Sequence, residues 1–372
     1  MPEIVVVGGG IAGAFTAYFL AGFGAGVTLV ERDEIGGQAS GRNPGGLNPH
    51  HGAGIPGPLH DLALTSFRLH LEAWDDIRRR ARTDFGAQQV PRLHIALDER
   101  DLQALERAAE PYASAPGFAA TWIRGADLRA HEPGLATGLL GGLLTEGNAR
   151  VDAPAYTRAA AAAAADLGAR TLQGEVRDLR HSGGRVTAVV LDSEPLRCDG
   201  VAIASGPWCA QAARWLDAHI PVEPVKGEML AVAPRAGGVR CAVTWRDAAT
   251  YPAGGPEVWI GGTEDRVGFD DQPSPAARTS IVERISRILP TMADARVVRH
   301  TAGLRPVTPD GAPIVGIPRG WENACLVLGA GRKGMLLSAG MGLAAAELLT
   351  SGRTGVPLDS CSPDRWAVAA PR

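Results

Sequence analysis

The first residues whose spacing could do chemistry are three glycines near the N-terminus. Gly8, Gly10 and Gly13 follow a short apolar run and precede a segment of small and apolar residues. In this spacing Gly8 permits a tight turn, Gly10 lets the backbone approach a pyrophosphate, and Gly13 lets a helix pack closely on a strand. The helix would begin near Ile11 and Ala12, and its N-terminal N–H groups and positive dipole favour phosphate binding.

A carboxylate stands at the second position that a dinucleotide requires. The apolar run at residues 27–30 ends on Glu31, which Arg32 follows. A carboxylate at the end of this second strand accepts hydrogen bonds from a ribose diol and disfavours a 2′-phosphate. Glycines alone are weak evidence in a chain with 48 of them. Strand, glycines, helix, second strand and acid together predict a dinucleotide-binding βαβ unit.

A polar, glycine-rich loop after the second strand distinguishes an FAD site from a site for a nicotinamide dinucleotide. Such a loop can wrap a second phosphate and lie flat against a ring system. A nicotinamide dinucleotide held by its βαβ unit needs nothing similar, so the loop predicts FAD. The candidate contacts in this loop are Ser40, Gly41, Arg42, Asn43, Gly45 and Gly46.

Hydrophobic periodicity predicts the elements that position these residues. Helices are expected at residues 11–21, 60–80, 99–111, 156–167 (with seven consecutive alanines), 280–289 and from about 334 to 349. Strands are expected at 4–7, 27–30, 89–97, 171–176, 186–191, 201–204 and 324–328, with a hairpin turn at 182–184 between the strands at 171–176 and 186–191. Alternating segments over 221–263 fit an antiparallel sheet. No internal repeat is evident.

Composition excludes several classes of protein. A formal net charge of -3 gives no electrostatic footprint for nucleic acid or an anionic membrane. The N-terminus lacks a signal-peptide pattern, and no apolar run approaches the roughly 20 residues of a membrane helix. Five cysteines without a C-x-x-C pair fit reduced thiols. These features predict a cytoplasmic protein without an integral membrane segment or a metal site, and they leave its oligomeric state open, including assembly as a homo-oligomer.

Several short motifs, in order and spacing, resemble the D-amino-acid oxidase superfamily of flavoenzymes, most closely glycine oxidase and the sarcosine oxidases. The resemblance covers nearly the whole chain. Besides the opening unit it rests on residues 39–43, 201–208, 225–227, 259–263, 303–306, 309–311 and 329–337. It implies cofactor contacts at Val176, Ser205, Gly206 and Trp208, and in the last glycine loop at Gly331, Arg332, Lys333, Gly334 and Met335.

The resemblance also implies a fold and its domain boundaries. The expected class is α/β, with a Rossmann-like FAD-binding domain of the glutathione-reductase type and a substrate domain on a large antiparallel sheet. Residues 1–85, 146–220 and 300–372 are assigned to the FAD-binding domain. Residues 86–145 and 221–299 are assigned to the substrate domain.

The implied reaction is oxidation of an amine that carries a carboxylate. Hydride passes to flavin N5, the imine hydrolyses, and O2 reoxidises the flavin with release of H2O2. Arg305, in the Gly-Leu-Arg-Pro motif, is expected to bind the substrate carboxylate through its planar charged fork. Arg332 or Lys333 could assist oxygen reduction, and a merely solvated side chain is the equal alternative at either position.

The chain departs from glycine oxidase at two positions. A tyrosine expected near the substrate falls at Ala249, and Tyr251, on the same face of a strand, is its candidate replacement. A histidine expected in the last glycine loop falls near Ala330. Both changes remove bulk, which favours an N-substituted glycine or another amino acid over glycine.

Other residues and other functions stay open. His51 is a further catalytic candidate, and His50, His300, Glu264 and Asp265 are weaker ones. A D-amino-acid or L-proline-type dehydrogenase that reduces a quinone or carrier, a 2-hydroxy-acid oxidase, and a flavin-binding partner protein without turnover are the competing functions.

Overall fold

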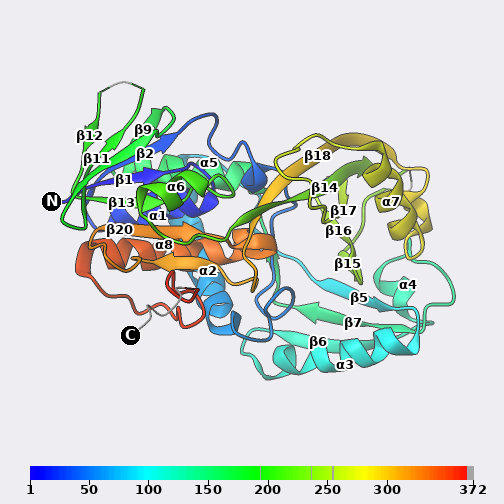
Figure 1. The fold of residues 1–372 in the computed structure, drawn as a ribbon. Helices are drawn as coiled ribbons and strands as arrows, with labels where there is room; N and C mark the ends of the chain where they lie inside the picture. Colours follow the sequence, from blue (N-terminus) through cyan, green and yellow to red (C-terminus); the bar gives the residue numbers. More distant parts are fainter. Residues whose placement is uncertain (193, 236, 254, 367–372) are drawn as a thin grey trace.

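The computed structural model describes residues 1–366 except 193, 236 and 254, and it is organised around two large sheets that lie side by side (Figure 1). The first sheet has the order β19-β20-β13-β1-β2-β9. Its strands are parallel apart from β19, which runs antiparallel to β20. The bounds are β1 (Glu3–Val7), β2 (Gly26–Glu31), β9 (Arg170–Gln173), β13 (Gly200–Ile203), β19 (Ile314–Gly316) and β20 (Ala324–Leu328).

Both faces of this sheet are covered, which explains why β1, β13 and β20 are continuous apolar runs, whereas the edge strand β9 is polar and mostly exposed. Ile4 and Val6 of β1 join a core with four helices, whereas Val5 and Val7 join a core on the opposite face. The four helices are α1 (Ile11–Gly22), α2 (His60–Ala81), α5 (Ala153–Asp166) and α8 (Gly334–Ser351). The opposite face is covered by β10 (Asp178–Ser182), β11 (Arg185–Val190), β12 (Leu196–Arg197) and α6 (Ala210–Trp215).

The second sheet has the order β18-β14-β17-β16-β15-β5-β7-β6. Neighbouring strands are antiparallel except for β15 and β5. The bounds are β5 (Arg92–Ala96), β6 (Ala119–Arg124), β7 (Gly141–Glu146), β14 (Glu223–Ala233), β15 (Ala242–Trp245), β16 (Ala248–Pro252), β17 (Val258–Gly261) and β18 (Arg296–Val307). Three helices lie against it: α3 (Glu99–Ser114), α4 (Leu128–His131) and α7 (Pro275–Ser286).

The predicted α/β class with a large, mostly antiparallel second sheet is confirmed, and the short elements between the sheets complete it. A small sheet joins β3 (Gly46–Leu47), β8 (Ala149–Arg150) and β4 (Gln88–Gln89). Three 3-10 turns are η1 (Ala39–Gly41), η2 (Pro290–Met292) and η3 (Gly331–Lys333). An isolated bridge between Val307 and Ala330 links the end of β18 to the last glycine loop. The division into five domain stretches stays a prediction.

Several predicted elements are corrected. The strand expected at 89–97 is divided into β4 and β5, because Pro91 has no N–H for a ladder. The strand expected at 171–176 ends at Gln173, and the 182–184 turn joins β11 to β10, a strand that its polar sequence concealed. The helix expected at 280–289 spans Pro275–Ser286, because the Ser274 side chain accepts a hydrogen bond from the backbone N–H of Ala277.

The structure shows where the cysteines and the most apolar long helix lie. All five cysteines lie in the described part of the chain, and each is a buried, free thiol. Among the described residues, one helix at Gly331–Ser351 is long and apolar enough to cross a membrane, and 61% of that window is buried in the fold. This helix packs against α1 and α2, as the core helix of a globular protein does.

Candidate active site

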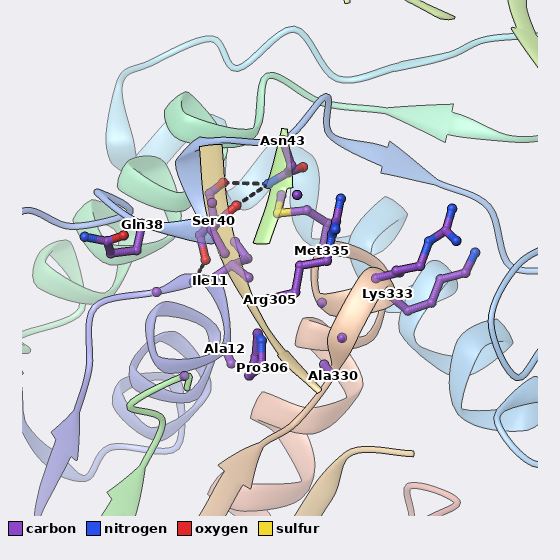
Figure 2. Close-up of a pocket in the computed structure, with 18 of the residues that line it drawn as sticks. Ile11, Ala12, Gln38, Ser40, Asn43, Arg305, Pro306, Ala330, Lys333 and Met335 are labelled. Atoms are coloured by element: carbon purple, nitrogen blue, oxygen red, sulfur yellow. Dashed lines mark hydrogen bonds between the residues drawn. The ribbon is translucent and has the colours of Figure 1, made fainter. Parts of the chain in front are cut away.

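One cavity of about 750 Å³ extends from the α1 N-terminus to the second sheet. Its wall includes all five predicted catalytic residues: His51, Tyr251, Arg305, Arg332 and Lys333. Figure 2 shows Arg305 entering from β18, Lys333 from the turn before α8, and Ser40 and Asn43 on another part of the wall. The predicted dinucleotide and substrate residues therefore share one continuous space.

The end of the cavity at α1 fits a pyrophosphate. Gly10 is the N-cap of α1 and has no side chain that could cap the helix, so the first-turn N–H groups after that of Ile11 receive no cap from this residue. The Ile11 N–H donates to Ser40 Oγ at 3.0 Å. A Cβ on Gly8 would lie 2.5 Å from the Ala204 carbonyl oxygen, so only glycine allows this turn.

Unsatisfied polar atoms along the same wall also fit a bound ligand. Gln38 Oε1, Asn48 Oδ1 and Ser205 Oγ are buried and have no hydrogen-bond partner among the described residues. All three residues line the cavity. Buried polar atoms normally find partners, so these positions suit the polar groups of a nucleotide.

Glu31 ends β2 beside this region. Its carboxylate accepts hydrogen bonds from the backbone N–H groups of Gly9, at 2.6 Å, and Asp33, at 2.9 Å. These bonds orient the carboxylate at the cavity wall, where a ribose diol could donate to its remaining lone pairs. The Arg32 guanidinium lies 4.4 Å from the centre of the Trp208 ring, and both side chains line the cavity.

Arg42 and Asn43 shape the loop that the sequence assigned to FAD. Asn43 Nδ2 donates to the carbonyl oxygens of Ala39 and Ser40 at 2.9 Å, and its Oδ1 accepts from the Gly45 N–H at 2.8 Å (Figure 2). The Arg42 guanidinium donates to the carbonyl oxygens of residues 37 and 302 and to the carboxylate of residue 271. Both side chains therefore use much of their hydrogen-bonding capacity to hold the loop against β18.

Most predicted cofactor residues line the cavity, and three glycines do not. Those on the wall are Gly8, Gly10, Ile11, Ala12, Glu31, Arg32, Ser40, Arg42, Asn43, Gly46, Val176, Ser205, Gly206, Trp208, Gly331, Arg332, Lys333, Gly334 and Met335. Gly13, Gly41 and Gly45 lie behind it, where a Cβ would come within 1.9, 2.3 and 1.9 Å of backbone oxygens. These three permit close backbone packing, which is the role expected of Gly13 from its motif.

Arg305 is held by the segment that follows β17 and by the neighbouring strand β14. Its guanidinium donates to the Thr263 carbonyl oxygen at 2.9 Å. On β14, a Cβ on Gly227 would lie 2.1 Å from the guanidinium, so this glycine makes the space that Arg305 occupies. Burial and the charge of Arg332 lower the pKa of Arg305. An arginine still stays protonated at neutral pH, so the site holds a permanent positive charge.

Tyr251 and Ala249 both line the cavity from β16, as their predicted common face requires. The Tyr251 ring lies 4.8 Å from the guanidinium of Arg92. Arg92, on β5, is a cavity residue that sequence reasoning missed. It sits in an ordinary strand pattern far along the chain from every motif, so no local signal marks it.

Lys333 and His51 lie together on the wall, near the guanidinium groups of Arg92 and Arg332. Lys333 Nζ donates to the carbonyl oxygens of Asn48, at 3.2 Å, and His51. Burial and the charges of Arg92 and Arg332 lower the pKa of Lys333 to about 7. Burial and the same cationic neighbours lower the pKa of His51 to about 4, so His51 is neutral at pH 7.

The weaker candidates lie outside the cavity wall. The buried His50 ring packs 4.4 Å from Phe118. His300 Nε2 lies 2.8 Å from a Glu228 carboxylate oxygen. Glu264 lies 3.6 Å from the Arg332 guanidinium, and Asp265 bridges to β14 through its backbone. Of these, Glu264 contacts a cavity residue, whereas His50, His300 and Asp265 contact residues outside the cavity or the backbone of β14.

Comparison with known proteins agrees with this geometry. The family model described as FAD dependent oxidoreductase matches residues 3–348. The chain is 30% identical to a glycine oxidase of Pseudomonas aeruginosa, across 94% of this chain and 95% of that protein. It is 28% identical to a D-amino acid dehydrogenase of Methylobacterium nodulans, across 99% and 100%. The crystal structure of glycine oxidase from Geobacillus kaustophilus superposes with a TM-score of 0.92 at 27% identity, covering 98% and 99%.

Proposed function

The chain belongs to the family of FAD-dependent oxidoreductases, and from this premise we propose that it oxidises the secondary or primary amine of a glycine-like substrate. The expected substrate is an N-substituted glycine, with O2 as electron acceptor and H2O2 as product. We further propose that it acts in the cytoplasm, which its five buried free thiols support.

The observation that carries this proposal is Arg305 in the cavity. A half-buried, permanently charged fork suits bidentate binding of a carboxylate. Gly227 leaves free the space that the Arg305 guanidinium occupies, and the Thr263 carbonyl oxygen orients this guanidinium. The guanidinium is therefore in place before substrate binds. Such positioning fixes which carbon of the substrate faces the oxidant.

FAD supplies the oxidising power when bound, because it accepts a hydride from the carbon beside the nitrogen and leaves an imine that water hydrolyses. The residues that would hold it are the glycines of the α1 turn, Glu31 and the loop around Ser40. Ala249, on the same strand as Tyr251, and Ala330 line the cavity with small side chains and so leave room for a substituent on the substrate nitrogen. The chain then needs no side-chain base, since hydride transfer requires alignment and a neutral amine.

A dehydrogenase is the second candidate, because the D-amino acid dehydrogenase relative matches across nearly its entire length. Aerobic turnover of N-methylglycine separates the two. We expect one H2O2 for each glyoxylate and methylamine, or for each glycine and formaldehyde, that is released. Turnover that requires an added quinone or dye and yields no peroxide would favour the dehydrogenase. Oxidation of 2-hydroxy acids but of no amine would refute the proposed function.

A further inference from the structure

Arg92 is a buried cation that pairs with no carboxylate in the described part of the chain. It is 5% exposed, and one guanidinium nitrogen donates to Thr244 Oγ1 at 2.9 Å. Its Nε is buried and unpartnered, and no carboxylate lies within 4.0 Å of the guanidinium, among the residues that the structure describes. By contrast, Arg246, on the same cavity wall, bonds to Asp98 and Asp101.

A second cation adjoins Arg92. Lys333 is close enough that the charges of Arg92 and Arg332 help to lower its pKa. Its ammonium group contacts only the carbonyl oxygens of Asn48 and His51 in the described residues. His51, whose pKa is lowered by the same cations, adds no negative charge. This part of the wall therefore concentrates positive charge that the protein does not neutralise.

The cluster is distinct from the predicted carboxylate site but shares its cavity. Arg305 lies on β18, at one edge of the second sheet, whereas Arg92 lies on β5. Tyr251 lies on β16, which stands between β18 and β5 in the sheet order, and its ring contacts the Arg92 guanidinium. A ligand beside Tyr251 could therefore contact Arg305 with one end and Arg92 with the other.

Burying a guanidinium without an anion is costly, and the cost is offset when an anion binds. We propose that Arg92, assisted by Lys333, binds a second carboxylate of the substrate, which is then a dicarboxylic amine. The inference rests on the proposed function and specifies its substrate class. Oxidation occurs at the carbon beside the carboxylate on Arg305, and the second carboxylate stays chemically unchanged.

The first test needs no variant. Acetate, propionate, malonate, succinate and glutarate are titrated into the wild-type FAD-bound enzyme, and the change in flavin absorbance gives each Kd. We expect at least one dicarboxylate to bind about tenfold or more tightly than the matching monocarboxylate. Equal or weaker binding by every dicarboxylate would overturn the inference.

The second test compares two amines that differ in one carboxylate. Anaerobic flavin reduction is followed with N-carboxymethylglycine and with N-methylglycine in wild type, in Arg92→Gln and in the control Arg185→Gln, whose arginine pairs with Glu322 away from the cavity wall. A charge-assisted bidentate contact predicts that Arg92→Gln weakens binding of N-carboxymethylglycine about 10- to 100-fold. Binding of N-methylglycine should change less than about twofold, and Arg185→Gln should resemble wild type.

The outcomes separate the two proposals. Equal losses for both amines in Arg92→Gln would mean that Arg92 serves the flavin or the fold, and the second-carboxylate site would be rejected. Reduction of wild type by N-methylglycine, with no gain from the added carboxylate, overturns this inference and leaves the proposed function intact. If neither amine reduces the flavin of the wild-type enzyme, both the proposed function and the second-carboxylate site are refuted.

Discussion

Replacing Gly227 with alanine perturbs Arg305 without altering its charge. The new Cβ would lie 2.1 Å from the guanidinium, at the end of a flexible side chain that can move away. The backbone of β14 need not shift, so the fold and the bound FAD should persist. The guanidinium, however, would no longer occupy the position in which it receives a carboxylate.

The expected loss of kcat/KM follows from the hydrogen bonds between Arg305 and the substrate carboxylate. Hydrogen bonds to charged groups contribute about 1.5–3 kcal/mol each. Displacement of the Arg305 guanidinium should remove one of its two hydrogen bonds to the substrate carboxylate and weaken the other. A loss of about 2–4 kcal/mol corresponds to a roughly 30- to 900-fold lower kcat/KM. Because a misplaced carboxylate also misaligns the reacting carbon, both kcat and KM should change.

The assay is steady-state oxidation of N-methylglycine, with the FAD content and Tm of each variant measured in parallel. Gly22→Ala is the matched control, because nothing lies within 4 Å of its added Cβ. In a double-mutant cycle, Gly227→Ala should cause little further loss in an Arg305→Ala background. Wild-type kcat/KM in Gly227→Ala, or additive losses in the cycle, would refute the positioning of Arg305 described above.

Three further predictions concern the rest of the cavity. Lys333, with a pKa of about 7 beside Arg92, Arg332 and His51, should bind a dicarboxylate inhibitor more tightly below pH 7. Its Kd should rise as pH increases from 6 to 8 and become nearly independent of pH in Lys333→Met; a Kd that falls over this range contradicts the charge assignment. Glu31→Ala should weaken FAD binding to the apoprotein about tenfold in a fluorescence titration, and an unchanged Kd would exclude a ribose contact. Gly13→Ala should lower unfolding free energy by about 2 kcal/mol or more in denaturant melts, because its Cβ would collide with backbone; unaltered stability would contradict that packing.

The nucleotide-binding half could be predicted from the sequence because its constraints are local. The βαβ unit needs glycines, a helix start and a carboxylate at fixed offsets, and each stands where the structure places β1, α1 and β2. The last glycine loop before α8 follows the same logic. Boundaries were less predictable where local composition misleads, as for the polar strand β10.

The substrate end depends on contacts between distant segments. Arg92 lies on β5 and meets Tyr251 of β16 only because β15 stands between these strands. The space for Arg305 likewise depends on Gly227 of β14, which pairs with Gly303 across the ladder. Such pairings follow from sheet order, which hydrophobic periodicity does not specify.

The most direct measurement is anaerobic mixing of the purified yellow protein with an amine panel while flavin absorbance is recorded. The panel contains glycine, N-methylglycine, longer N-alkyl and N-carboxymethyl glycines, D-amino acids and L-proline, with 2-hydroxy acids for comparison. Faster bleaching by N-substituted glycines than by glycine is the predicted result. Bleaching by 2-hydroxy acids alone, or by no compound, would contradict the assignment of this protein as an amine oxidase.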